Sequence, residues 1–268
     1  MSQKPDPHIS AEVKINLTIL VLGAMVMILN ETALSVALPT IMADFGIPAT
    51  SAQWLLTGFL LTMGVVIPTT GFLMDKFTTR QIFLASSGVF LAGTVLAALA
   101  PAFGVLLVGR VFQATGTALM IPTLMTVAMT LVPPQRRGSV MGIISVVISV
   151  APALGPTVGG FVLSMSSWHV IFWTMAPLLG LICAAGYFRL VNVGDKRDTP
   201  LDFPSVVLSV FAFGGLVYAV SSLENMLEGD GLVDIVVLIV GLVALALFTR
   251  RQLRLAKDNR ACLLYTSP

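Results

Sequence analysis

The sequence predicts an all-α polytopic membrane protein, and its composition, its apolar run lengths and its charge distribution each support that fold class. Hydrophobic residues make up 56% of the 268 residues and charged residues 10%, whereas soluble domains contain roughly 45–50% and about 25%. The mean hydropathy is +0.95. The apolar runs are continuous and do not alternate with a period of two, and an open sheet would leave backbone groups unpaired in lipid. We therefore expect helices that span a bilayer.

Eight apolar stretches approach the ~20 residues that a helix needs to cross a bilayer. They cover residues 15–38, 52–74, 81–100, 103–131, 139–165, 170–190, 205–223 and 232–248. The eighth is the shortest. We expect no ionisable residue within the last two spans, so this pair should lie loosely at the periphery with few polar contacts to the first six.

Segments that carry basic residues alternate along the chain with loops that carry none. Lys and Arg total 15, and all except Arg110 fall in the two terminal tails or in the loops at residues 75–80, 132–138 and 189–204. The intervening loops carry only acidic charges, among them Asp44 and Asp234. Because cytoplasmic loops are enriched in Lys and Arg, the pattern predicts that both termini face the cytoplasm and supports the count of eight spans.

On this basis the chain divides into six segments. Residues 1–14 are a cytoplasmic tail, 15–190 a six-helix unit, 191–204 a cytoplasmic linker, 205–249 an added helix pair, 250–260 a basic cytoplasmic segment and 261–268 a non-native tail. The last segment reads Ala-Cys-Leu-Leu-Tyr-Thr-Ser-Pro, which resembles translated read-through of a sequencing adaptor. We therefore expect the chain to be a truncated part of a longer protein.

Several function classes are disfavoured by the same residues. The formal net charge of +2 is too small to indicate a nucleic-acid partner. The sequence contains no phosphate-binding Gly-x-x-x-x-Gly-Lys, its 2 histidines are isolated, and no nucleophile lies beside a plausible base. The sequence thus predicts no enzyme activity, no cofactor and no metal site.

Two ionisable residues lie well inside predicted spans. Glu31 is about eight residues before the outer end of the first span, and Arg110 is about seven residues after the outer start of the fourth. At 1.5 Å per residue both lie roughly 10–12 Å below the outer boundary. A lone charge there costs at least ~2.5–3.5 kcal/mol, which a partner of opposite sign offsets. Two interpretations follow: a structural ion pair that holds the bundle together, or a protonatable carboxylate with its positive partner beside a cavity.

The fifth span contains a run rich in proline and glycine, from Ala151 to Gly160. Gly159 follows Gly155 by four positions, so both fall on one helix face and allow a neighbouring helix to approach closely. Pro156 removes a backbone donor and is expected to kink the helix. Ordinary tight packing is the alternative interpretation. The members of the run that we single out are Pro152, Gly155, Pro156, Gly159 and Gly160.

Other side chains carry weaker signals. Trp54 and Trp168 are expected near the outer boundary, as belt aromatics are. Five methionines could line an adaptable pocket but are expected rather to pack in the core or to face lipid. They are Met63, Met120, Met125, Met129 and Met175.

Two segments resemble motifs of the major facilitator superfamily. The first joins the second and third spans and has Thr78 where the superfamily pattern usually has glycine; its other members are Gly71, Asp75, Lys76 and Arg80. The resemblance implies that these charges help to close the cytoplasmic side. The second resembles the superfamily's helix 4 motif and contains Arg110, Gln113, Gly116 and Pro122.

Three further segments narrow the resemblance to the fourteen-span drug–proton antiporters of that superfamily. The run from Ala151 to Gly160 resembles the antiporter motif, and Trp168-His169 resembles the junction of helices 5 and 6, with histidine in place of the usual arginine. In the first span the family's common form has aspartate where this chain has Asn30, and the acid follows at Glu31. That displacement is a rotation of ~100° about the helix.

The resemblance implies a six-helix N-terminal transporter half followed by an inserted helix pair, in a bacterial cytoplasmic membrane. It implies efflux of amphipathic drugs or toxic compounds by alternating access in the intact protein, with the proton as coupling ion, Glu31 and Arg110 as the proton-coupling residues, and a C-terminal half that is missing here. A metabolite or peptide exporter of the same fold is the first alternative. A membrane scaffold that transports nothing is the second.

Overall fold

The computed structural model describes residues 9–192, 203–221 and 232–257, and its regular structure over these ranges is entirely helical. The bounds are α1 Ala11–Phe45, α2 Ala49–Lys76, α3 Thr79–Ala98, α4 Phe103–Leu131, α5 Pro134–Met165, α6 His169–Arg189, α7 Phe203–Ser221 and α9 Leu232–Lys257. The all-α prediction is confirmed. The proposed tail at residues 261–268 and most of the linker at 191–204 lie outside the described residues.

Seven of the described helices are long and apolar enough to cross a membrane, and α7 supplies a shorter apolar stretch, Pro204–Val220. The prediction that the eighth span is the shortest was wrong: α9 has 26 residues and α7 has 19. The helix continues past the apolar run because Arg, Gln, Leu and Lys are all good helix formers. Most of the segment predicted as a basic tail is therefore the last two turns of α9.

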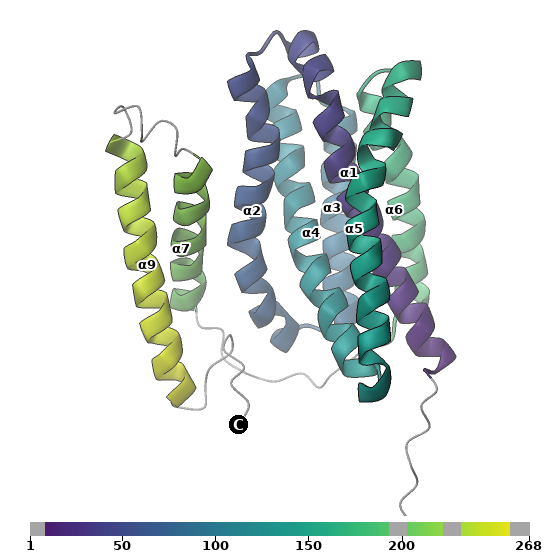
Figure 1. Ribbon diagram of the computed structural model, residues 1–268, viewed down its shortest axis with the longest axis vertical. Helices are drawn as coiled ribbons and strands as arrows, with labels where there is room; N and C mark the ends of the chain where they lie inside the picture. Colours follow the sequence, from purple (N-terminus) through teal and green to yellow (C-terminus); the bar gives the residue numbers. More distant parts are fainter. Residues whose placement is uncertain (1–8, 193–202, 222–231, 258–268) are drawn as a thin grey trace, which may run out of the picture.

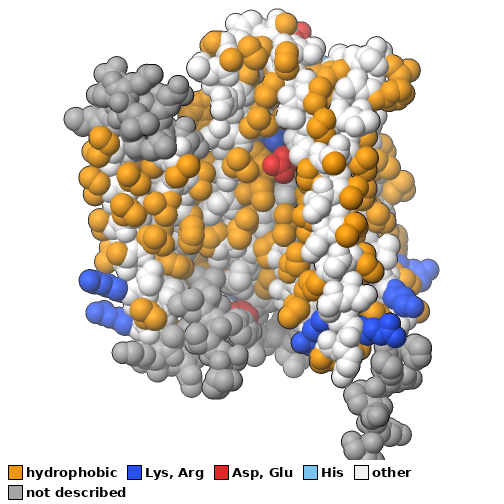
Figure 2. Space-filling view, viewed as in Figure 1, with side chains coloured by type: hydrophobic (Ala, Val, Ile, Leu, Met, Phe, Trp, Pro, Cys, Tyr) orange, Lys and Arg blue, Asp and Glu red, His pale blue; other side chains and the backbone are white. Residues whose placement is uncertain are grey.

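The helices stand side by side, with α1 to α6 in one bundle and the α7–α9 pair next to α2 (Figure 1). Hydrophobic side chains cover the flank of the molecule, and Lys and Arg side chains gather at one end of the helices (Figure 2). These basic ends belong to α1, α5, α6 and α9 (Figure 1), and they carry Lys14, Arg136, Arg189 and Arg250. Their position at one end of the bundle agrees with the charge pattern of the sequence.

Small residues allow the helices of the bundle to touch. A Cβ placed on Gly93 of α3 would lie 2.6 Å from the Gly109 carbonyl oxygen of α4. A Cβ on Gly116 would lie 2.6 Å from the Cβ of Phe90, and the Ser86 hydroxyl donates to the Gly116 carbonyl at 2.8 Å. Close backbone approach of this kind is how helices associate in lipid, where the hydrophobic effect contributes little.

The close approach predicted for α5 is confirmed. A Cβ on Gly155 would lie 2.7 Å from the Cβ of Thr32 in α1, and one on Gly159 would lie 2.7 Å from the Ala33 carbonyl oxygen. Nothing lies within 4 Å of the corresponding position at Gly160. The helix runs without interruption through Pro152 and Pro156.

The α7–α9 pair packs more closely than expected. A Cβ on Gly64 of α2 would lie 3.1 Å from the Val217 side chain of α7, and a Cβ on Gly215 would lie 3.0 Å from the Cα of Gly241 in α9. At the other end of the pair the Gln252 amide donates to the Ser205 hydroxyl at 2.9 Å.

The expectation that these two spans hold no ionisable residue was wrong, because Asp234 lies in the first turn of α9 and is 7% exposed. A carboxylate is favoured there by the partial positive charge of the helix N-terminus.

Candidate functional site

A polar layer crosses the bundle between two apolar clusters. One cluster contains Met27, Phe90 and Leu124, and the other contains Leu34, Leu106 and Phe172. Between them, α1 contributes Asn30 and Glu31, α3 contributes Thr94, and α4 contributes Arg110 and Gln113. Polar side chains in such a position are costly unless each finds a partner, so their partners are the main question.

Arg110 is fully buried, with 0% of its surface exposed. Its Nε donates to the Leu55 carbonyl oxygen of α2 at 3.2 Å, and its Nη1 donates to the Gln113 Oε1 at 3.0 Å. Its guanidinium carbon lies 4.1 Å from the centre of the Phe59 ring. The prediction that Arg110 faces the interior of the bundle is confirmed, and three groups on two helices hold its guanidinium in one orientation.

Gln113 transmits this restraint to α3. Its amide nitrogen donates to the Thr94 hydroxyl at 3.0 Å, and that hydroxyl donates to the Phe90 carbonyl at 2.9 Å. All three side chains in the chain, Arg110, Gln113 and Thr94, are fully buried. Because each acceptor is itself held by a further hydrogen bond, the position of the guanidinium depends on α2, α3 and α4 together.

Glu31 is the charged neighbour of this network. It is half-buried on α1 and interacts electrostatically with Arg110. The hydrogen bonds of Arg110 go to neutral groups, and its Nη2 has no hydrogen-bond partner among the described residues. Figure 2 shows an acidic side chain next to a basic one in a furrow of the face turned to the viewer. In this conformation Arg110 is therefore held without a direct bond to Glu31.

Asn30 and Glu31 occupy different environments, although they are adjacent in sequence. Asn30 is 0% exposed, and neither its side-chain oxygen nor its nitrogen has a hydrogen-bond partner in the part of the chain that the structure describes. Glu31 is partly exposed. The rotation of ~100° between neighbouring helix positions thus puts the amide in the packed interior and leaves the acid partly exposed.

The loop between α2 and α3 lies far from this layer. Twenty residues of α2 separate Leu55 from Asp75, a rise of ~30 Å. The Arg80 guanidinium donates to the Tyr187 backbone carbonyl of α6 and lies 4.8 Å from the centre of the Tyr187 ring. Its backbone N–H donates to the Asn192 side chain at 3.3 Å. Of the other predicted loop residues, Gly71 lies within α2, Asp75 is half-buried, and Lys76 is exposed.

Thr78 has a structural reason to stand where the superfamily pattern usually has glycine. Its hydroxyl accepts from the Gln81 backbone N–H, and the Gln81 side chain accepts from the Thr78 N–H at 3.0 Å. This capping box satisfies two donors that would otherwise be unpaired at the start of α3. The loop is therefore fixed locally, by the cap of α3 and by the end of α6.

Trp168, which is expected near the outer boundary, is buried and not exposed to lipid as a belt aromatic would be. The residue is 1% exposed, its indole N–H donates to Asp44 of α1 at 2.9 Å, and it stacks on His169 at 3.5 Å. It joins the end of α1 to the start of α6. Trp54, by contrast, is 42% exposed, and the centre of its ring lies 6.4 Å from that of Tyr218.

Sequence reasoning missed the partners of Arg110. The Leu55 acceptor is a backbone carbonyl, which every residue possesses, and Phe59 is one of 15 phenylalanines. Thr94 sits in an apolar run with no charge near it in sequence. The spacing of Arg110 and Gln113, three residues apart on one helix face, was the one signal available.

Comparison with known proteins settles the family, because residues 20–255 match the family described as Major Facilitator Superfamily. The chain belongs to this superfamily. It is 44% identical over 239 residues to an uncharacterized MFS-type transporter, YcnB, of Bacillus subtilis, which covers 89% of this chain and 50% of the relative. It is 42% identical over 238 residues to the lincomycin resistance protein LmrB of the same organism, covering 87% and 49%.

Solved structures of the superfamily share the fold at low sequence identity. The human organic anion transporter MFSD10 matches with a TM-score of 0.61 at 17% identity, over 78% of this chain and 55% of that one. A D-xylose–proton symporter matches with a TM-score of 0.57 at 13% identity, over 92% and 70%. The chain spans about half the length of the curated relatives it matches, at 50% and 49%.

Proposed function

We propose that the intact protein, of which this chain supplies the N-terminal part, exports amphipathic compounds from a bacterial cell in exchange for protons. The observation that carries the proposal is the electrostatic interaction of Glu31 with a buried Arg110 whose hydrogen bonds go to other groups. A membrane scaffold gains nothing from a charge at this depth, which costs at least ~2.5–3.5 kcal/mol.

The hydrogen bonds of Arg110 suit a coupling role for Glu31. Burial favours the neutral form of a carboxyl group, and a nearby guanidinium favours the ionised form. Because Leu55 and Gln113 hold the guanidinium, Arg110 keeps its place whether Glu31 is charged or neutral. Glu31 can therefore gain and lose a proton without collapse of the network around it.

Glu31 also stands apart from the other acidic residues. Glu12 and Asp234 lie in the first turns of α1 and α9, and Asp44 and Asp75 lie in the last turns of α1 and α2. Among the carboxylates that the structure describes, Glu31 alone lies in the middle of a helix. A carboxylate at a helix end can exchange protons with bulk water directly, whereas one in mid-membrane exchanges them only where a cavity opens.

The packing of α5 against α1 could couple Glu31 to the conformational change of alternating access. Gly155 and Gly159 contact Thr32 and Ala33, which follow Glu31 directly in α1. Any tilt of α5 against α1 therefore acts on the turn that carries the carboxylate. In transporters of this class, rocking of the two halves exposes a midplane site to each side in turn. A second half would supply the other wall of that cavity.

The substrate class rests on relatives. A lincomycin resistance protein is 42% identical to this chain, and a protein named multidrug resistance protein B homolog, from Mycobacterium tuberculosis, is 31% identical over 209 residues. We therefore place amphipathic drugs ahead of metabolites or peptides as substrates.

The test uses the intact protein in liposomes. A pH gradient should drive lincomycin and a fluorescent amphipathic dye across the membrane against their concentration gradients, and an uncoupler should abolish the movement. Accumulation that is indifferent to the uncoupler would exclude proton coupling. If the gradient drives a metabolite or peptide but no amphipathic compound, the substrates are metabolites or peptides and the proposed substrate class is wrong.

A further inference from the structure

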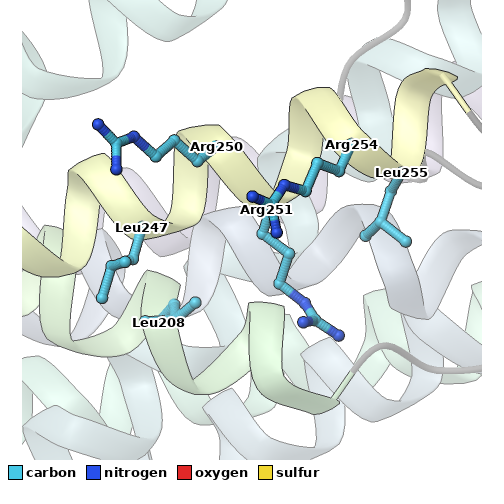
Figure 3. Close-up of a pocket in the computed structure, with 6 residues that line it drawn as sticks. All are labelled: Leu208, Leu247, Arg250, Arg251, Arg254 and Leu255. Carbon is cyan, nitrogen blue, oxygen red and sulfur yellow. The ribbon is translucent and has the colours of Figure 1, made fainter.

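The basic C-terminal end of α9 forms a pocket with α7, outside the six-helix bundle. Its volume is about 380 Å³, and three arginines and three leucines line it: Leu208, Leu247, Arg250, Arg251, Arg254 and Leu255. Leu208 comes from α7 and the others from α9 (Figure 3). In that view Leu247 and Leu208 lie between the two helices, and Arg251 extends toward α7. The pocket thus combines an apolar floor with a cationic rim.

The arginines stand at the depth of lipid headgroups. The apolar span of α9 begins at Val233, and seventeen residues at 1.5 Å each place Arg250 ~26 Å along the helix. The hydrocarbon core of a bilayer is ~30 Å thick. Measured from Val233, Arg250 therefore lies just inside one edge of that core and Arg254, at ~32 Å, just beyond it, close to the level of the phosphate groups.

An exposed apolar stripe on α9 leads directly to these arginines. Val236, Val240, Val243 and Leu247 are each about half exposed, and they follow one another at intervals of four, three and four residues. That spacing keeps them on one helix face. The next positions on the same face, three and seven residues on, are Arg250 and Arg254. A single surface therefore changes from hydrocarbon-like to cationic along its length.

The chemistry of this surface matches one kind of molecule. A guanidinium forms paired hydrogen bonds to phosphate oxygens, which gives arginine its preference for phosphate groups. Basic pockets between membrane helices on the cytoplasmic side are known to bind anionic lipid headgroups. No carboxylate is among the described residues that line this pocket. An anionic phospholipid supplies both a phosphodiester for the rim and an acyl chain for the stripe.

We propose that this pocket binds the phosphodiester headgroup of an anionic phospholipid, with an acyl chain lying along Val243 and Leu247. Such a lipid would tie the added helix pair to the cytoplasmic leaflet. The proposal concerns α7 and α9 and does not rest on the proton-coupled export proposed above.

The test measures retention of phosphatidylglycerol and of phosphatidylcholine by the purified chain in detergent, by native mass spectrometry. We expect tighter retention of phosphatidylglycerol. The double variant Arg250→Gln/Arg254→Gln should retain it roughly tenfold or more weakly, since each basic residue at a lipid surface contributes to anionic lipid attraction. Arg251 stays in place in this variant because it is half-buried.

The matched control is Arg136→Gln/Arg189→Gln, which removes the same charge from exposed residues of α5 and α6 on the same side of the bundle. It should retain phosphatidylglycerol as the unaltered chain does. Equal losses in the two double variants would show a diffuse charge effect and overturn the proposal. So would equal retention of the two lipids, or displacement of phosphatidylglycerol by inorganic phosphate at equal concentration.

Discussion

At the residue scale, the central feature is a buried arginine whose partners are neutral. A charge inside a membrane bundle is normally explained by an opposite charge in contact with it. Arg110 instead donates to the Leu55 carbonyl and to Gln113, and it lies over the ring of Phe59. Glu31 contributes at longer range. Of the two interpretations of the sequence, a structural ion pair would need a direct bond between Arg110 and Glu31. The position of the arginine does not depend on such a bond, so the structure favours the interpretation of Glu31 as a protonatable carboxylate.

This network makes Gln113 a positioning residue with a measurable role. Gln113→Leu keeps the approximate size of the side chain but leaves Arg110 Nη1 without its acceptor. It also removes the donor to the Thr94 hydroxyl, which keeps its own bond to the Phe90 carbonyl. A buried polar group without a partner costs ~1–3 kcal/mol, so the free energy of unfolding in detergent should fall by about that amount. Thermal or denaturant unfolding of the purified chain measures it.

The control for this prediction is Gln53→Leu, an equivalent change at an exposed position of α2. It should change stability by no more than about 0.5 kcal/mol, as surface substitutions generally do. If Gln113→Leu is no more destabilising than Gln53→Leu, the hydrogen-bonded chain from Arg110 to Thr94 does not contribute to the stability of the bundle.

At the element scale, the α1–α5 contact shows how glycine positions decide where two helices touch. Gly155 and Gly159 contact α1 directly, while Gly160 faces open space. Adjacent glycines in one motif therefore have opposite tolerances. The contact also places the small-residue face of α5 against the turn that follows Glu31, which links a packing feature to the proposed coupling residue.

The paired variants Gly159→Ala and Gly160→Ala test this assignment. A methyl group at residue 159 would lie 2.7 Å from the Ala33 carbonyl oxygen, and overpacking of this kind costs ~1–3 kcal/mol. A methyl group at residue 160 meets nothing within 4 Å and should be neutral or stabilise the helix by about 0.5–1 kcal/mol. Unfolding in detergent should place Gly160→Ala level with or above the unaltered chain in stability and Gly159→Ala below it. The reverse order of the two variants would show that α5 does not contact α1 through this face.

Most of the helices and their approximate bounds could be predicted from the sequence, and the features that could not have physical causes. Long apolar runs predict membrane helices because lipid demands them, and α4 was predicted at its observed bounds, Phe103–Leu131. The end of α9 was missed because its arginines are polar yet favour helix. The burial of Trp168 was missed because the sequence does not reveal that Asp44, 124 residues away, accepts its N–H. The acceptor of Arg110 on α2 was beyond reach for the same reason: tertiary contacts of backbone carbonyls leave no trace in residue types.

At the scale of the whole molecule, the chain is a bundle of six helices with a pair attached along α2 (Figure 1). It spans about half the length of the curated relatives it matches, 50% of one and 49% of another. Transporters of this superfamily bind substrate between two halves. The proposed cavity therefore has one wall here and needs a second.

It follows that these residues alone should transport nothing. The purified chain in liposomes, given a pH gradient and a fluorescent amphipathic dye, should show no dye accumulation above that of empty liposomes. Folding of the chain is checked in the same sample by its helical circular dichroism. Protein-dependent uphill movement would mean that the chain forms a working transporter by itself, for example as a dimer, and would remove the need for a second half.

The central claim is that Glu31 carries the coupling proton, and Glu31→Gln in the intact protein tests it most directly. The substitution keeps the shape and polarity of the side chain but removes its ability to release a proton. The measurement is accumulation of lincomycin in liposomes driven by an imposed pH gradient, with Glu31→Asp as the variant that retains a titratable group. We predict that Glu31→Gln is folded and inserted but abolishes uphill accumulation, while Glu31→Asp retains part of it. Undiminished gradient-driven accumulation by Glu31→Gln would contradict the account.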